Sequence, residues 1–276
     1  MEALRQLPSL IGHRDPHHLD QPIVAVQDVS LRYQGNTALD HVSFALTTGE
    51  QVAVVGPNGA GKSTLFKIIA GVLQPTTGQV EVYGSGPGGH ICIAYVPQRS
   101  QVDWQFPVNV ADVVMMGRTR RLGLFRRPAK QDWQYVQQCL EVVGMAHLAS
   151  RQIGELSGGQ QQRVFIARAL AQEAALMLMD EPLTGLDVRS QEDIFGVLGE
   201  LRQRHVTVMI ATHDLNLAAE RFDRVMLLNH HLVGFGPPDT VFTPDKLLAA
   251  YGGHMRLINT TDGMAALSDT CCDGHE

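Results

Sequence analysis

The chain has 276 residues, 44% of them hydrophobic, and a formal net charge of −6 with an isoelectric point near 6.0. This length allows one large domain, or one domain with a subdomain, and the acidic balance argues against a nucleic-acid partner. No apolar run approaches the ~18 residues of a membrane span, and residues 1–20 lack the apolar core of a signal peptide. We therefore expect a cytosolic protein with a well-buried core.

The first 46 residues predict a leader followed by an antiparallel pair of strands. Residues 1–21 are aperiodic and contain prolines and histidines, which is typical of a flexible leader. Residues 23–33 and 42–46 alternate apolar and polar side chains around a turn at Gln34-Gly35-Asn36, which indicates two paired strands. Tyr33 ends the first strand, where it could stack on a nucleotide base or be an ordinary edge aromatic.

A strand, a glycine-rich loop and a helix follow one another between residues 51 and 70. The loop, Gly56-Pro57-Asn58-Gly59-Ala60-Gly61-Lys62-Ser63-Thr64, matches the phosphate-binding pattern G-x-x-x-x-G-K-[ST] in its required strand-then-helix context. Glycines let backbone N–H groups surround a phosphate, and the helix start adds unpaired N–H groups and the positive end of its dipole. We expect Lys62 to contact the β- and γ-phosphates and the Ser63 hydroxyl to bind Mg²⁺.

Two further strands are predicted at residues 79–83 and 90–96. The segment between them, residues 84–89, also fits G-x-G-x-x-G. A dinucleotide site is excluded because a strand follows where a helix is required, and because Pro87 interrupts the pattern. We therefore predict a glycine-rich hairpin loop, with Gln98 just beyond the exit of the second strand.

A helical region is predicted from about residue 108 to residue 170. The spacing of Trp133, Val136, Leu140 and Val143 gives one apolar helix face. Five arginines in its early part are typical of a solvated face, although with the neighbouring aromatics they could also form a partner surface; they are Arg118, Arg120, Arg121, Arg126 and Arg127. Cys92 and Cys139 lie in apolar segments and are expected in the core, and no disulfide framework is indicated.

A second helix start has the features of an anion site. In Leu156-Ser157-Gly158-Gly159-Gln160, Ser157 is a plausible N-cap and the two glycines expose helix N–H groups. We call residues 156–160 the signature segment and residues 56–64 the phosphate loop.

Polar residues follow two buried strands in the second half of the chain. The apolar run at residues 174–179 predicts a parallel strand that ends in Asp180 and Glu181, at the edge where open α/β sheets bind ligands. Asp180 suits Mg²⁺, and Glu181 suits the activation of a water molecule. His213 follows the next buried strand, residues 206–211, and so reaches the same edge; a lone histidine is more often structural.

The remaining segments complete the fold. An amphipathic helix is expected around residues 194–201, closing strands at 224–229 and 231–235, and a short helix at 243–251. Residues 252–276 are loosely patterned. Their Cys271-Cys272-Asp273-Gly274-His275 run could hold a soft metal ion, but is more typical of a disordered terminus.

Taken together, these motifs resemble those of the ATP-binding cassette (ABC) ATPases. The phosphate loop, Gln98, the signature segment, residues 178–182, Gly185-Leu186-Asp187 and His213 occur in the family's order over about residues 23–245. Leu-Ser-Gly-Gly-Gln is highly specific to that family in this context. The resemblance implies an α/β P-loop NTPase (RecA-like) core with a mixed sheet, an N-terminal antiparallel β subdomain and an α-helical subdomain at about residues 100–170. The expected division is a leader at 1–21, an ATPase domain at 22–245 and an extension at 246–276.

The resemblance also implies roles in ATP hydrolysis. Glu181 is expected to be the catalytic base, His213 the γ-phosphate switch, and Gln98 the residue that senses Mg²⁺ and reports to a membrane partner. Tyr33 would stack on adenine. The residues expected to bind ATP are Tyr33, Gly56, Asn58, Gly59, Gly61, Lys62, Ser63, Thr64, Ser157, Gly158, Gly159, Gln160 and Asp187, and those expected at Mg²⁺ are Ser63, Gln98 and Asp180.

In this family two cassettes pair head to tail. The resemblance therefore implies that Ser157 and Gly159 of one copy close on the ATP held by Lys62 of the other, with Asp187 near the shared interface. This arrangement explains why one chain has two phosphate-binding helix starts but a single loop lysine.

A narrower resemblance concerns the partners. Residues 95–99, 102–108 and 116–128 are similar to the ATPases of manganese, zinc and iron importers. The likeness implies a peripheral protein on the cytoplasmic face of the membrane, with an integral permease and, indirectly, an extracytoplasmic metal-binding protein as partners. Manganese is the first expectation, with zinc or iron open. The alternative is a soluble, non-transport ABC ATPase that acts in cofactor assembly.

Overall fold

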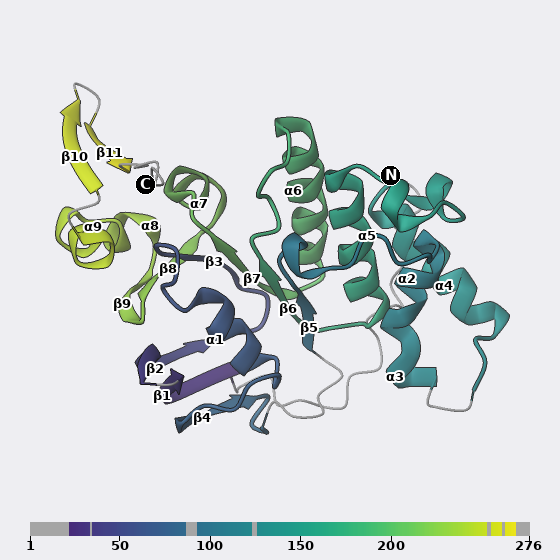
Figure 1. Cartoon of the computed structure of the whole chain (residues 1–276), viewed down its shortest axis with the longest axis horizontal. Coiled ribbons are helices and arrows are strands. Elements are labelled where there is room, and N and C mark those ends of the chain that lie inside the picture. The colour runs from purple at the N-terminus through teal and green to yellow at the C-terminus, as the bar shows by residue number, and fades with distance from the viewer. Residues whose placement is uncertain are drawn as a thin grey trace, which may run out of the picture.

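The computed structural model describes residues 22–33, 35–86, 93–122, 126–252, 255–260 and 263–268. The predicted leader, Cys92 and the Cys271–His275 run lie outside these residues. Within them, three sheets and a group of helices form the α/β architecture that the sequence predicts (Figure 1). None of the described helices is both long enough and apolar enough to cross a membrane.

A six-stranded mixed sheet forms the centre, in the order β5-β6-β7-β3-β8-β9. The first five strands in this order are parallel, and β9 runs antiparallel to β8. Their bounds are β3 (Gln51–Val55), β5 (Ile93–Val96), β6 (Leu176–Asp180), β7 (Thr207–Thr212), β8 (Arg224–Asn229) and β9 (His231–Gly236). Because parallel strands share their carboxyl edge, the segments that follow β3, β6 and β7 meet there.

Successive apolar residues of β3 face two different cores. Val52 and Val54 pack with α1 (Lys62–Ile69) and the antiparallel sheet, whereas Ala53 and Val55 pack with the helices on the opposite face. Every residue of β6 and β7 is buried. This burial on both faces confirms the fully buried parallel strands that the apolar runs predict.

The antiparallel sheet has the order β2-β1-β4, with β1 (Val24–Tyr33), β2 (Asn36–Leu46) and β4 (Thr77–Val82). The predicted pairing of the first two strands is confirmed. The predicted hairpin around residues 84–89 is wrong, because β4 pairs with β1 while β5 pairs with β6 in the central sheet. The strands on either side of that glycine-rich segment therefore belong to different sheets, a long-range choice that local turn residues do not encode.

Residues 99–122 and 126–171 form a helical lobe beside the central sheet (Figure 1). Its elements are η2 (Arg99–Gln101), α2 (Val110–Met115), η3 (Met116–Arg118), α3 (Thr119–Leu122), α4 (Lys130–Val142), η4 (Ala146–Leu148), η5 (Ile153–Glu155) and α5 (Gly158–Ala171). Val136, Leu140 and Val143 are buried as the spacing predicts, but Trp133 is 41% exposed. Cys139 is buried, as expected.

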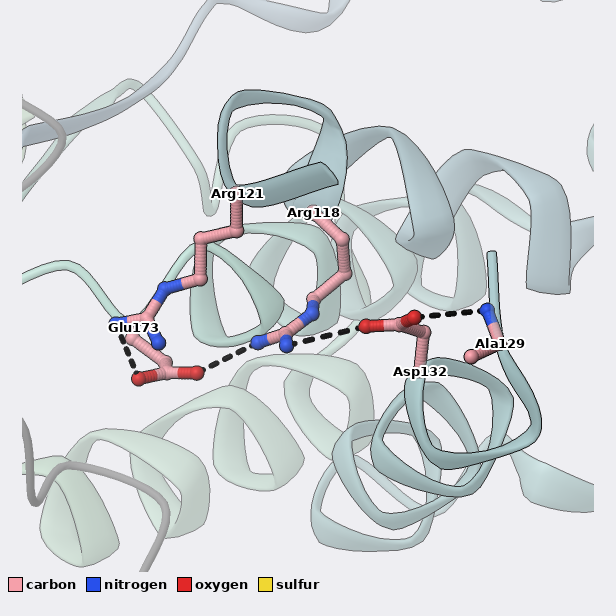
Figure 2. A network of polar contacts seen from close by, with 5 residues as sticks. All are labelled: Arg118, Arg121, Ala129, Asp132 and Glu173. Atoms are coloured by element: carbon pink, nitrogen blue, oxygen red, sulfur yellow. Dashed lines mark hydrogen bonds and ion pairs between the residues drawn. The ribbon is translucent and has the colours of Figure 1, made fainter. Parts of the chain in front are cut away.

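A network of ion pairs holds one end of the helical lobe together (Figure 2). Arg118 donates from Nη1 to Oε1 of Glu173 over 2.6 Å, and its Nη2 lies 3.3 Å from Oδ1 of Asp132. Arg121 pairs with the other oxygen of Glu173 at 2.5 Å, and Asp132 accepts a hydrogen bond from the N–H of Ala129. The network thus joins η3, α3 and the start of α4 to the segment that follows α5.

This network corrects the expectation of a solvated arginine face. The Arg118 side chain is only 12% exposed, and its guanidinium lies 4.3 Å from the ring centroid of Tyr135. Arg126 and Arg127 are exposed, as predicted. The run of like charges therefore divides: Arg118 and Arg121 pair with an acidic side chain that the fold brings near, whereas Arg126 and Arg127 are solvated.

The second half of the chain adds helices and a terminal hairpin. α6 (Val188–Gln203) buries the predicted residues Ile194, Val197, Leu198 and Leu201. It is followed by α7 (Leu215–Arg221), α8 (Pro238–Val241) and α9 (Pro244–Tyr251), the last being the predicted short helix. β10 (Met255–Thr260) and β11 (Gly263–Ser268) pair antiparallel, although the sequence pattern predicts no strand there.

Candidate functional site

The phosphate loop connects β3 to α1 and encloses the side chain of Lys62. The Nζ of Lys62 donates hydrogen bonds to the carbonyl oxygens of Gly56 (2.6 Å) and Pro57 (2.9 Å), and the residue is only 6% exposed. Burial lowers the pKa of Lys62, and the nearby Glu181 and Asp180 oppose that shift. The loop therefore holds the ammonium group of Lys62 at a position where it would attract a polyanion.

Two glycines of the loop are required by its neighbours. A Cβ on Gly56 would stand 2.0 Å from the carbonyl oxygen of Leu228 in β8. Gly61 caps α1 with a φ of 94°, and a Cβ there would stand 2.5 Å from the carbonyl oxygen of Ala38. The loop is thus seated between β8 and β2, in a conformation that side chains would obstruct.

The two predicted carboxylates follow each other at the end of β6. Asp180 is 1% exposed and shares a hydrogen bond with the hydroxyl of Ser63, and burial raises its pKa. A hydroxyl and a carboxylate side by side are oxygen donors of the kind that Mg²⁺ prefers, so these two residues fit the expected cation.

Glu181 has a left-handed backbone conformation, with a φ of 48°. Its N–H donates to the carbonyl oxygen of Ala211 in β7 over 3.1 Å. Its Oε2 accepts hydrogen bonds from Nε2 of Gln98 (3.0 Å) and from Oγ1 of Thr184 (3.3 Å). A conformation that is unfavourable for a residue with a Cβ is therefore maintained by contacts on both its backbone and its carboxylate.

These groups, apart from the buried Asp180, line one cavity of about 930 Å³ at the carboxyl edge of the sheet. Its volume is that of a pocket for a nucleotide-sized ligand. Of the sequence-predicted residues, the fold brings to this cavity Gly56, Asn58, Gly59, Gly61, Lys62, Ser63, Thr64, Gln98, Glu181 and His213. His213 is exposed, and the next residue, Asp214, caps α7 by accepting a hydrogen bond from the N–H of Leu217.

The other predicted residues do not line this cavity. Tyr33 lies at the end of β1 and is 46% exposed. Ser157 caps α5, accepting from the N–H of Gln160 (3.4 Å), while the side chain of Gln160 accepts from the N–H of Ser157 (2.9 Å). This capping box uses the N–H of Gln160 at the start of a 14-residue helix, and none of residues 157–160 is among those that line the cavity around Lys62.

Asp187 lies beside the signature segment rather than beside Lys62. Its carboxylate accepts from the N–H and the hydroxyl of Ser190, both at 2.9 Å, and these bonds lower its pKa. A Cβ on Gly159 would stand 2.5 Å from Oγ of Ser190, so the starts of α5 and α6 are in close contact. The Nε of Arg99 also donates to Oε1 of Gln161, which links the segment after Gln98 to α5.

Three residues of this region are not predicted as site residues by the sequence. Thr184 lines the cavity and binds Glu181, and its position three residues beyond Glu181 is a signal that could have identified it. Tyr95 donates from its hydroxyl to Oδ2 of Asp180 over 3.3 Å. Tyr251 reaches the cavity from α9, and no local pattern indicates that contact. In the described part of the chain, no three histidine, cysteine or acidic side chains gather as a metal site.

Comparison with known proteins agrees with this geometry. The family model described as ABC transporter matches residues 39–184. The manganese transport system ATP-binding protein MntB of Halalkalibacterium halodurans is 46% identical over 243 residues, which cover 87% of this chain and 96% of that protein. The zinc transport system ATP-binding protein TroB of Treponema pallidum is 45% identical, over 84% of this chain and 88% of its own length.

Solved structures give the same result. A chain of a metal-chelate type ABC transporter in an inward-facing conformation superposes with a TM-score of 0.76 at 31% identity, covering 89% of this chain and 96% of that one. The cbiO1 protein of Clostridium perfringens, part of the transporter complex cbiONQ, gives a TM-score of 0.70 at 27% identity, covering 83% and 94%. The predicted resemblance is thereby confirmed: the chain belongs to the ABC transporter family, among its ATP-binding proteins.

Proposed function

We propose that this chain is the ATP-binding and ATP-hydrolysing subunit of an importer for a divalent transition metal. The observation that carries the ATPase part is the position of Glu181, whose carboxylate lies at the same cavity as Lys62 and accepts a hydrogen bond from Gln98. A phosphate-binding loop and a held carboxylate at one cavity are the two parts that phosphoryl transfer to water requires.

The residues suggest a division of tasks. The loop N–H groups and Lys62 would bind the β- and γ-phosphates, and Ser63 with Asp180 would hold Mg²⁺, which neutralises phosphate charge when bound. A water molecule then attacks the γ-phosphorus while Glu181 accepts its proton, and ADP leaves with the β-phosphate oxygen. His213 is placed to contact the γ-phosphate, and Gln98 to report the state of the cation.

We propose that the active form is a head-to-tail dimer. Within one chain the signature segment and Asp187 form a surface apart from the Lys62 cavity, so one copy has a phosphate-binding helix start that its own ATP would not reach. A second copy would supply Ser157, Gly158, Gly159 and Gln160 to the ATP held by Lys62, and Tyr33 would stack on the adenine.

We also propose that the chain is divided into a leader at 1–21, an ATPase domain at 22–245 and an extension at 246–276.

The transport part rests on similarity over most of the chain to proteins named for manganese and zinc transport. By this analogy the partners are an integral permease and, indirectly, an extracytoplasmic metal-binding protein, and the chain works on the cytoplasmic face of the membrane. Manganese is the first candidate substrate, because several of these relatives carry its name, and zinc or iron follow.

The test is metal-resolved uptake in cells whose only copy of this chain carries Glu181→Gln. Loss of the proton acceptor should abolish uptake of one metal among manganese, zinc and iron, while the chain still co-purifies with membranes. Glu141→Gln, at an exposed position on α4, is the matched control and should leave uptake unchanged. Normal uptake of all three metals in the Glu181→Gln cells would contradict the proposal.

A further inference from the structure

The end of β5 supplies one hydrogen-bond donor to each of the two carboxylates at the end of β6. The strands are parallel neighbours, with Tyr95 opposite Leu178 and Val96 opposite Met179. From this register the hydroxyl of Tyr95 donates to Oδ2 of Asp180 over 3.3 Å, and the amide of Gln98 donates to Oε2 of Glu181 over 3.0 Å. The two donors lie three residues apart on one segment.

Tyr95 is built into the sheet rather than into the cavity wall. Its ring packs against the core that contains Leu176 and Leu178, and it is not among the residues that line the cavity. A hydroxyl at the end of a packed ring has little freedom to move, so its hydrogen bond fixes the direction in which it holds a partner.

Asp180 requires such a partner. It is 1% exposed, so its carboxylate cannot be held by bulk water, and a buried carboxylate without donors is strongly disfavoured. Among the described residues, the side chains that hydrogen-bond to it are Ser63, itself an expected cation ligand, and Tyr95. A donor on Oδ2 from the neighbouring strand limits rotation of the carboxylate and so fixes where its other oxygen points.

We propose that Tyr95 is a positioning residue that orients Asp180 for Mg²⁺. This inference rests on the proposed Mg-ATP hydrolysis and adds a residue whose effect is specific to the cation. Removing the hydroxyl should weaken the Mg²⁺-dependent part of nucleotide binding on the order of tenfold, the usual effect of losing an outer partner of a metal ligand. Binding of ATP without the cation depends on the phosphate loop and should not change.

The experiment uses Tyr95→Phe in the full chain, because phenylalanine keeps the ring and removes only the hydroxyl. ATP affinity is measured by calorimetry in EDTA and over a series of Mg²⁺ concentrations, and kcat is measured over the same series. We expect the Mg²⁺ concentration that gives half of the maximal kcat, and half of the maximal gain in ATP affinity, to rise about tenfold. The ATP affinity in EDTA should be unchanged, and kcat should be largely recovered at high Mg²⁺.

Tyr83→Phe, beyond the end of β4 and away from the cavity, is the matched control and should alter neither measurement. Tyr95→Met, which also fills the site without a hydroxyl, repeats the test if the phenylalanine variant does not fold. An unchanged Mg²⁺ dependence, or an equal loss of ATP affinity in EDTA, would overturn the inference. If the unmodified chain binds no ATP or hydrolyses none with Mg²⁺, the proposed function itself fails instead.

Discussion

The side-chain amide of Gln98 donates to Oε2 of Glu181 over 3.0 Å, although the two residues are 83 positions apart in sequence. Gln98 immediately precedes η2, where the helical lobe begins, and Glu181 immediately follows β6. A displacement of the lobe would therefore be transmitted directly to the carboxylate that we assign as the base. The bond gives a physical route between a partner docked on the lobe and the hydrolytic site.

Gln98→Ala should lower kcat for ATP hydrolysis on the order of tenfold with little change in ATP affinity. The carboxylate of Glu181 would lose its donor and its fixed direction, while the phosphate loop would be untouched. Steady-state hydrolysis and calorimetric ATP binding check the two halves of this expectation. Gln101→Ala, at an exposed position of η2, is the control and should behave as the unmodified chain. A Gln98→Ala protein with an unreduced kcat would refute the positioning role.

Gly56→Ala should destabilise the protein by about 1–3 kcal/mol and weaken ATP binding, because the added Cβ would stand 2.0 Å from the Leu228 carbonyl oxygen. Backbone cannot move away as a flexible side chain can, so the phosphate loop must shift. Gly199→Ala in α6 is the matched control, since its Cβ meets open space and alanine is the better helix former by about 0.5–1 kcal/mol. The urea concentration at the midpoint of unfolding should therefore fall for Gly56→Ala and rise for Gly199→Ala. A stabilised Gly56→Ala protein would contradict the close contact between the loop and β8.

Lys62→Met should abolish ATP binding while raising the free energy of unfolding of the nucleotide-free protein near neutral pH. Burial lowers the pKa of Lys62 below its ordinary 10.5, so the unfolded chain holds this proton more tightly than the folded one. The charged form therefore opposes folding, and the penalty is relieved as the pH rises through the folded pKa toward that of the unfolded chain. The gain from Lys62→Met should be largest near pH 7 and smaller at pH 10.

Chemical denaturation of both proteins at pH 7 and pH 10 measures this difference. Lys67→Met, on the same helix but in its last turn, provides the comparison, because that side chain is only partly buried. If Lys62→Met is less stable than the unmodified chain at both pH values, the hydrogen bonds to Gly56 and Pro57 outweigh the cost of burying the ammonium group.

Site residues that belong to a local motif or to a strand end can be predicted from the sequence, whereas those held by contacts between distant segments cannot. The phosphate loop is a local motif, and parallel pairing brings Glu181 and His213 to the same sheet edge from a general rule about strand ends. The contacts that hold these groups are between distant segments. Tyr95 and Thr184 are ordinary residues in sequence, and only the register of β5 against β6 and the turn after Glu181 bring their hydroxyls to the carboxylates.

The errors in the fold prediction have the same origin. The wrong hairpin between β4 and β5 follows from treating adjacent strands as partners, when each forms its pairing with a strand far away in sequence. Arg118 resembles its neighbours in a polar run, and its burial depends on Glu173, which comes 55 residues later. Trp133 is likewise 41% exposed, although its spacing places it on the same helix face as the buried Val136 and Leu140.

Glu173→Gln should cost about 3 kcal/mol of stability, because it leaves the buried Arg118 without its principal counter-charge. The side chains of this pair are 9% and 12% exposed. Glu155→Gln removes the partner of Arg151 in a pair whose side chains are about half exposed, and should cost less than about 1 kcal/mol. Urea denaturation compares the two directly; equal costs would show that the network contributes no more than a surface ion pair.

Asp187→Ala should weaken ATP-dependent dimerisation more than the loss of a helix cap explains. Asp187 and Asp214 are both N-caps, of α6 and α7, and each accepts from the N–H three residues further along at 2.9 Å. Either substitution by alanine should therefore cost about 1 kcal/mol of stability. Only Asp187 lies against the signature segment, through Ser190 and Gly159, on the surface that we propose to meet a second copy.

The dimer is best measured by analytical ultracentrifugation with ATP in a Glu181→Gln background, where hydrolysis would not separate the copies. We expect Asp187→Ala to lower the dimer fraction clearly and Asp214→Ala to leave it near that of the parent, at equal thermal stability. Both variants lose an N-cap, and Asp187→Ala also loses the bond from the Ser190 hydroxyl, so the dimer fractions are compared at equal thermal stability, where a difference isolates the interface. Equal dimer fractions would place the contact between copies on another surface and leave Asp187 with a helix-capping role alone.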